Sequence, residues 1–205
     1  TQPDKPKGRG LKLSASPVKE FAEKMNIKVM TPVDLKSDEF YQILSELKPD
    51  LIAVVAFRIL PERIFSLPPF GTINLHASLL PKYRGAAPIN WAIIKGERKT
   101  GVTTFFIQKK VDTGSIILQK EVEISPEETC GQLSAKLSQI GADVLLKTID
   151  LIERGVVKTH FQDDSEATVA PKITDELCKI DWLSNLALPG HDDMPRAQPK
   201  SRVQF

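Results

Sequence analysis

An uninterrupted apolar run from Leu51 to Phe57 (LIAVVAF) constrains the fold of this chain more than any other segment. Such a run with β-branched residues is typical of a strand covered on both faces, as in the interior of a parallel sheet. Two helices are predicted before it, one capped by Ser16 and one by Ser37, because serine accepts a hydrogen bond from the first helical turn. A strand is expected between these helices at Ile27–Met30. Alternating helices and strands predict an α/β fold with a parallel sheet.

The rest of the chain adds further elements of both kinds. Ser125 and Glu128 have the spacing of a capping box at the start of the longest predicted helix, which keeps its apolar spacing until Gly155. Strands are also expected at 72–76, 102–107 and 115–121, and a short helix at 88–95. The first helix of the chain carries an apolar stripe that is expected to be buried, formed by Val18, Phe21, Ala22 and Met25.

Composition indicates one main domain. The chain has 205 residues, of which 41% are hydrophobic and 26% charged, and its net charge of +2 is too small to indicate nucleic-acid binding by itself. No apolar run is long enough for a membrane span, and the first residues do not form a secretory signal, so a cytoplasmic location is expected. The predicted division is a main domain at 1–155, a linker at 156–182 and an irregular tail at 183–205.

Two polar residues mark a candidate site at the end of the strand predicted at 72–76. Asn74 and His76 are two positions apart, so strand alternation directs both side chains to the same face. Ligands bind at the carboxyl ends of the strands of open α/β sheets, which favours a functional site. The alternative is a structural histidine whose hydrogen bonds are all satisfied.

Asp112 is the second candidate, because it lies in a Val-Asp-Thr-Gly turn between two predicted strands. A carboxylate on such a turn can reach a neighbouring strand end, where it would fix the tautomer of an imidazole and stabilise its protonated form. The alternative is a simple hairpin in which the aspartate bonds to its own backbone.

The beginning of the chain is a basic segment that holds several prolines and glycines, which predicts a loop. Its cationic side chains are Lys5, Lys7, Arg9 and Lys12. They suit phosphate groups, and the alternative is a solvated linker with scattered charge.

The stretch INLHASLLPKYRGAAPINWAI, from Ile73 to Ile93, and the VDTG turn at Val111 to Gly114 resemble the signature of the folate-dependent formyltransferases. The YRGAAPINWAI part is similar to the members that act on methionyl-tRNA, and the similarity extends from Thr1 to about Trp182. The resemblance implies a Rossmann-like, doubly wound, mostly parallel sheet. It also implies formyl transfer from 10-formyltetrahydrofolate to the amino group of initiator methionyl-tRNA, with no metal. Glycinamide ribonucleotide or an amino sugar as acceptor, or a non-catalytic remnant that binds folate or RNA, are the alternatives.

The same resemblance implies roles for individual residues. Asn74 would stabilise the oxyanion of a tetrahedral intermediate, His76 would assist proton transfer from the attacking amine, and Asp112 would orient His76 or a water molecule. Folate would be contacted by two segments, Phe57, Arg58, Ile59 and Leu60 in one and Ser78, Leu79, Leu80 and Pro81 in the other. For Leu79 and Leu80 of the second segment, the alternative is ordinary packing in the core.

For the basic segment, the resemblance implies that Arg9 enters the tRNA acceptor stem while Lys5, Lys7 and Lys12 meet phosphates. A monomer is expected. Family members that resemble this chain begin with a further strand and helix ahead of Thr1 and end with a small β-barrel. The resemblance therefore implies a catalytic domain that is incomplete at both ends and poorly stable, because a missing central strand leaves sheet edges unpaired.

Overall fold

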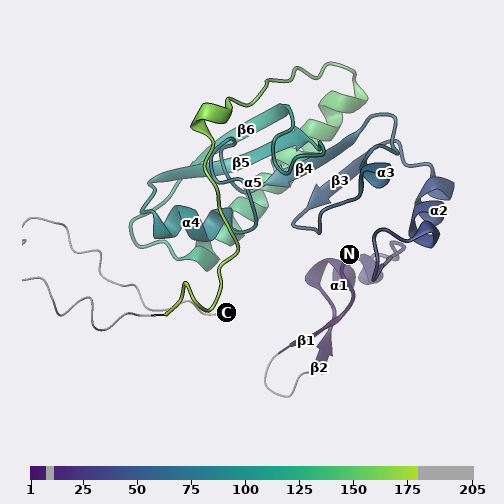
Figure 1. Cartoon of the computed structure of the whole chain (residues 1–205), viewed down its shortest axis with the longest axis horizontal. Helices are drawn as coiled ribbons and strands as arrows, with labels where there is room; N and C mark the ends of the chain where they lie inside the picture. The colour runs from purple at the N-terminus through teal and green to yellow at the C-terminus, as the bar shows by residue number, and fades with distance from the viewer. Residues whose placement is uncertain (8–11, 180–205) are drawn as a thin grey trace, which may run out of the picture.

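The computed structural model describes residues 1–7 and 12–179, and its centre is a four-stranded sheet (Figure 1). The strands follow one another in space in chain order, which is β3 (Ile52–Val55), β4 (Thr72–His76), β5 (Lys99–Phe106) and β6 (Ile116–Glu123). The strand predicted at 72–76 has the predicted bounds. The apolar run that starts at Leu51 supplies β3, but the expected cover on both faces was wrong, because β3 is an edge strand of the described sheet and Val55 is 51% exposed. The α/β class is therefore confirmed.

The sheet is mixed, so the prediction of a mostly parallel, doubly wound sheet was wrong. Only β3 and β4 pair in parallel, whereas β4 with β5 and β5 with β6 are antiparallel. The short connection at 107–115 lets the chain reverse directly from β5 into β6, and a parallel pair would need a long crossover instead. Apolar periodicity gives the faces of a strand but carries no information about its direction.

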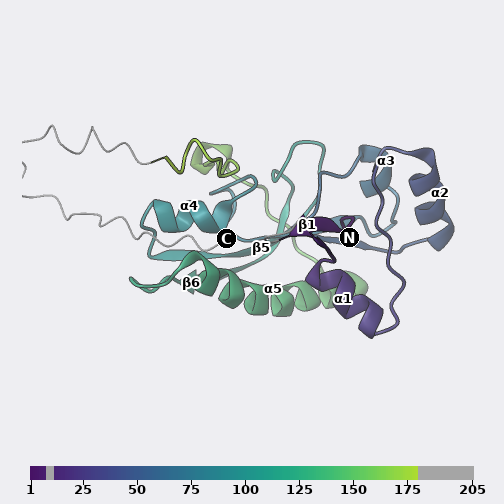
Figure 2. The same ribbon diagram turned by 90° about the horizontal axis from the view of Figure 1, so that it is seen from below.

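The two faces of the sheet are covered differently. The long helix α5 (Cys130–Glu153) lies along one face (Figure 2) and packs through Leu133 and Leu137 against Val102 of β5. The helix α4 (Pro88–Ile94) joins the same apolar cluster through Ala92. The other face of β4 and β5 meets a loop and the short helix α3 (Glu62–Phe65), so no layer of crossover helices covers it among the described residues.

Serine caps predicted from the sequence begin two helices. Ser16 accepts from Lys19 N–H at the start of α1 (Pro17–Lys24), and Ser37 accepts from Phe40 N–H at the start of α2 (Asp38–Leu47). The capping box of α5 is formed by Thr129 and Gln132, so its prediction at Ser125 and Glu128 was wrong. Glu128 accepts from Ser125 N–H one turn earlier, which makes that pair a turn before the helix.

The N-terminal region differs from the prediction in three ways. Strands β1 (Lys5–Lys7) and β2 (Lys12–Ser14) pair antiparallel, so regular structure flanks the predicted basic loop. The apolar stripe of α1 is exposed, with Phe21 62% accessible. The segment Ile27–Met30 forms no strand, because none of the described strands lies beside it to satisfy its backbone groups.

After α5 the chain returns across the sheet. His160 forms an antiparallel bridge with Ile116, and Val169 forms a parallel bridge with Arg84. We call residues 160–170 the strap; it contains the 3-10 turn η1 (Asp164–Glu166). The strap belongs to the predicted linker at 156–182, whereas the predicted tail at 183–205 lies outside the described residues. None of the helices at 1–7 and 12–179 has the length and apolarity needed to cross a bilayer.

Candidate functional site

The carboxyl end of β4 presents Asn74 and His76 on the same face, as strand alternation predicts. The intervening Leu75 points the other way and packs in the apolar cluster under α5. Asn74 is half-buried, while His76 is only 7% exposed. The sheet therefore holds an amide and an imidazole next to each other with little freedom to move.

A main-chain contact fixes the imidazole of His76. Its Nε2 atom lies 2.8 Å from the carbonyl oxygen of Tyr83. A carbonyl only accepts hydrogen bonds, so Nε2 carries the proton in the neutral ring and Nδ1 holds the lone pair. The neutral side chain can thus accept a second proton at Nδ1.

Asp112 faces that nitrogen. Its Oδ2 atom lies 3.9 Å from His76 Nδ1, and the carboxylate side chain is 9% exposed. Asp112 does not bond to its own backbone as in the hairpin alternative; instead, Oδ2 accepts from the main-chain N–H of Gly85 at 2.9 Å. The carboxylate therefore faces the ring nitrogen that holds the lone pair.

A cavity of about 820 Å³ opens beside these three residues, a volume in the usual range for a small-molecule site. Asn74, His76 and Asp112 all line it. The predicted folate-contacting segment that begins at Phe57 and ends at Leu60 lines it as well. The structure therefore brings one of the two predicted folate segments to the same cavity as His76 and Asp112.

Among the polar residues of the cavity that the sequence analysis missed are Asn90 and Gln108. Asn90 lies in the first half of α4, inside the motif from Ile73 to Ile93, so the motif itself was a signal for it. Gln108 follows β5 and stands near the turn that carries Asp112. No motif or periodicity in the sequence indicated a functional role for Gln108.

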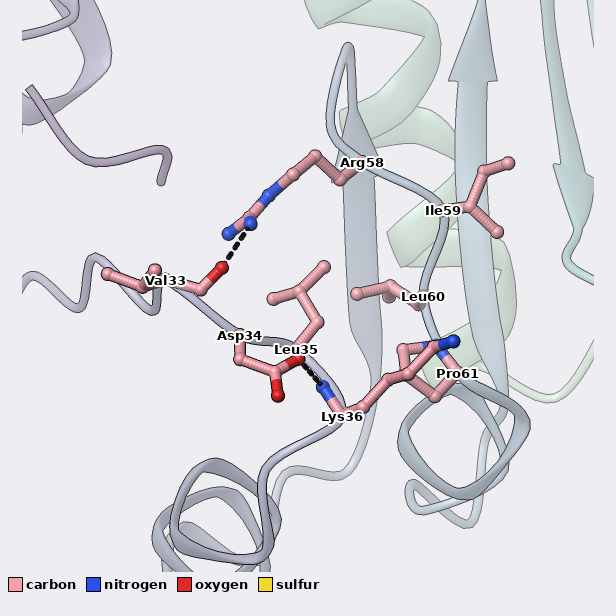
Figure 3. A pocket seen from close by; sticks show the side chains of 8 residues that line it. All are labelled: Val33, Asp34, Leu35, Lys36, Arg58, Ile59, Leu60 and Pro61. Carbon is pink, nitrogen blue, oxygen red and sulfur yellow. Dashed lines mark hydrogen bonds between the residues drawn. The ribbon is translucent and has the colours of Figure 1, made fainter. Parts of the chain in front are cut away.

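The guanidinium of Arg58 bonds to the loop that precedes α2. It donates to the carbonyl oxygens of Pro32 and, at 2.8 Å, of Val33, and Figure 3 shows it pointing toward Val33. Arg58 and Val33 border a second cavity, of about 420 Å³, with Leu35 and Pro61. Arg58 thus ties the predicted folate loop to the loop that precedes α2.

The segment Ser78 to Pro81 lines neither of these two cavities. Ser78 is fully buried, and its carbonyl oxygen accepts from the hydroxyl of Thr103 at 2.6 Å. Leu80 packs against Phe105 and precedes a cis peptide bond to Pro81. For Leu80, the structure matches the core alternative; the segment closes one face of the sheet.

Three of the predicted tRNA-binding residues, Lys5, Lys7 and Lys12, belong to the paired strands β1 and β2. Lys5 is exposed on β1. Lys7 and Lys12 end the two strands, and nothing is described of their side chains. Arg9 lies outside the described residues.

A mixed α/β sheet that presents an amide, an imidazole and a carboxylate in one cavity defines a domain equipped for acid–base chemistry on a small ligand. The chain belongs to the formyl transferase family, whose model matches residues 1–149.

Two curated relatives of the chain are both methionyl-tRNA formyltransferases. The chain is 52% identical over 187 residues to methionyl-tRNA formyltransferase of Flavobacterium psychrophilum, covering 91% of this chain and 59% of the relative. It is 54% identical over 183 residues to methionyl-tRNA formyltransferase of Alkaliphilus oremlandii, covering 89% of this chain and 59% of that one. The chain therefore spans about three fifths of the length of these relatives.

A solved structure has a similar fold. The formyltransferase PseJ from Anoxybacillus kamchatkensis, in complex with UDP-4,6-dideoxy-4-formamido-L-AltNAc and tetrahydrofolate, matches with a TM-score of 0.58 and 26% identity. The match covers 75% of this chain and 79% of that one.

Proposed function

We propose that this chain carries the catalytic site for formyl transfer from 10-formyltetrahydrofolate to the amino group of initiator methionyl-tRNA. The observation that carries the proposal is the facing pair of His76 Nδ1 and Asp112 Oδ2 beside Asn74, in a chain about half identical to methionyl-tRNA formyltransferases.

Each of the three side chains has one role in the proposed reaction. The amine nitrogen attacks the formyl carbon, and the carbonyl oxygen gains negative charge that the Asn74 amide N–H stabilises. His76 takes the proton of the attacking amine at Nδ1, and Asp112 stabilises the resulting cation. The bond between the formyl carbon and the folate nitrogen then breaks, and that nitrogen receives the proton that His76 took, which restores the neutral imidazole.

Folate is proposed to bind in the 820 Å³ cavity against the Phe57 to Leu60 loop. The burial of Ser78 and Leu80 supports an indirect role for the second predicted folate segment, in which it holds β4 and β5 together behind the cavity. No step of the proposal needs a metal ion, because a neutral amine is already a nucleophile.

The test is formyl transfer by the purified chain, with charged initiator tRNA and 10-formyltetrahydrofolate, beside His76→Ala. Circular dichroism establishes that both proteins are folded. Formylated product from the unchanged chain, with turnover about 100-fold lower in His76→Ala, is the expected result. A folded chain that forms no product would sink the proposal and favour a binding protein without catalysis.

The tRNA assignment has its own test, the double charge reversal Lys7→Glu with Arg9→Glu. It is expected to raise the KM for tRNA steeply and to weaken the salt dependence of binding, because fewer phosphates are neutralised. Lys48→Glu with Lys147→Glu makes the same charge change at two exposed sites away from the hairpin and serves as the control. Equal activity of both double variants would point to a small amine, such as an amino sugar, as acceptor.

A further inference from the structure

The strap lies outside residues 1–149, which the family model matches, and it makes a set of contacts around Asp112. Gln162 of the strap donates from Nε2 to the carbonyl oxygen of Asp112 at 2.9 Å and to that of Gly114 at 2.8 Å. Both amide protons of Gln162 are therefore used on the turn that carries the candidate carboxylate.

Arg84 fixes the orientation of this amide. Its Nε and Nη2 atoms lie 3.0 and 2.7 Å from Oε1 of Gln162. A guanidinium only donates, so Oε1 must face Arg84 and Nε2 must face the turn. Arg84 is itself held to the strap, since its N–H donates to Thr168 O and its carbonyl oxygen accepts from Ala170 N–H.

Asp112 needs such support because of its backbone. Its φ angle of 55° lies in the left-handed region, which is unfavourable for residues with a side chain. Gln162 holds its main-chain oxygen, and Gly85, the neighbour of Arg84, donates to its side chain at 2.9 Å. The strap thus forms hydrogen bonds with both loops that meet at Asp112, the loop that contains Arg84 and Gly85 and the turn that contains Asp112 itself.

From this geometry we infer that Gln162 is a positioning residue, which aims the Asp112 carboxylate at His76 through the main chain. The inference deepens the proposed function and rests on it. Arg84 orients Gln162, so a part of the chain distant in sequence from the acid–base pair sets its geometry.

The test uses Gln162→Glu, which keeps an acceptor for Arg84 but removes both donors to the turn. Gln162→Met removes the donors without adding a charge. The mirror substitution Glu166→Gln, on an exposed strap residue, is the matched control. Two readouts are measured, hydrogen exchange of the Gly85 amide by NMR and the kcat and KM of formyl transfer.

Both Gln162 variants are expected to speed Gly85 amide exchange about tenfold, since this amide bonds to Asp112. They are expected to lower kcat about tenfold or more with little change in KM for the formyl donor. In an Asp112→Asn background, Gln162→Glu should lower kcat no further, because both changes act on the same group. Glu166→Gln should match the unchanged chain in all respects.

Unchanged Gly85 exchange in both Gln162 variants would overturn the inference, as would full additivity with Asp112→Asn. A general loss of stability would accelerate amides throughout the sheet and raise KM as well, and that result would also reject a positioning role. If the unchanged chain transfers no formyl group, the proposed function fails by itself, while Gly85 exchange still decides whether Gln162 holds Asp112.

Discussion

His76 Nδ1 and Asp112 Oδ2 lie 3.9 Å apart, although β4 carries the histidine and the connection between β5 and β6 carries the aspartate. The separation exceeds a hydrogen bond, so the negative charge of the carboxylate faces the ring without bonding to it directly. The Tyr83 carbonyl fixes the tautomer from the opposite side.

The first prediction follows from this charge. Asp112→Asn keeps an oxygen for Gly85 N–H but removes the negative charge, so kcat for formyl transfer should fall by about 100-fold. The melting temperature should change little. Asp143→Asn, the same change at an exposed site on α5, should leave kcat unaltered. Equal kcat values for the two variants would remove Asp112 from the mechanism.

The second prediction concerns a buried hydroxyl pair, Thr104 of β5 and Thr148 of α5, whose oxygens are 2.7 Å apart. Thr148 donates its single proton to Val144 O, so Thr104 is the donor within the pair. Thr148→Val leaves the Thr104 hydroxyl proton without an acceptor. This variant should lower the free energy of unfolding by about 1–3 kcal/mol.

Thr104→Val should cost less, because Thr148 keeps its acceptor, and the double variant should recover part of the loss. Urea denaturation measures all three variants. If Thr104→Val proves the more damaging substitution, the assigned direction of the hydrogen bond is wrong.

The third prediction compares two glycines. A Cβ atom on Gly114 would lie 1.6 Å from the carbonyl oxygen of Phe106, so Gly114→Ala must displace the turn that carries Asp112. We expect a loss of more than about 2 kcal/mol in unfolding free energy. Gly131→Ala, in the first turn of α5, meets nothing within 4 Å and should be neutral or stabilising by up to about 1 kcal/mol. Thermal unfolding of both variants settles the comparison.

The fourth prediction concerns pH. The Ser125 N–H, and after it the ammonium of Lys136, holds the pKa of Glu128 below its usual value. A lowered folded-state pKa means that the carboxylate stabilises the fold above its unfolded pKa of about 4.3 and that this contribution disappears as pH falls through the folded value.

Glu128→Gln should therefore lower the melting temperature by about 2–4 °C at pH 7, and this difference should shrink as the pH is lowered to 3. Glu46→Gln, at an exposed position of α2, is the control and should have little effect at either pH. A difference between Glu128→Gln and the unchanged chain that persists undiminished at pH 3 would contradict the ionic explanation.

The sequence by itself determined the features that depend on neighbouring residues. The caps at Ser16 and Ser37 need only the next helical turn, and the shared face of Asn74 and His76 needs only strand alternation. The apolar run at Leu51 was enough to predict a strand, although its cover on one face was not, since Val55 of this edge strand is 51% exposed. These predictions rest on hydrogen bonds and periodicities that are complete within a few residues.

Tertiary structure alone decided strand direction, the exposure of the apolar stripe on α1 and the hydrogen bonds from Gln162 to the Asp112 turn. Each depends on which distant segment arrives as a partner. A short loop and a long crossover can connect strands of the same apolar pattern, and an amide such as Gln162 carries no periodic signal. The partners of these groups are set when the chain packs, so their positions along the sequence do not reveal them.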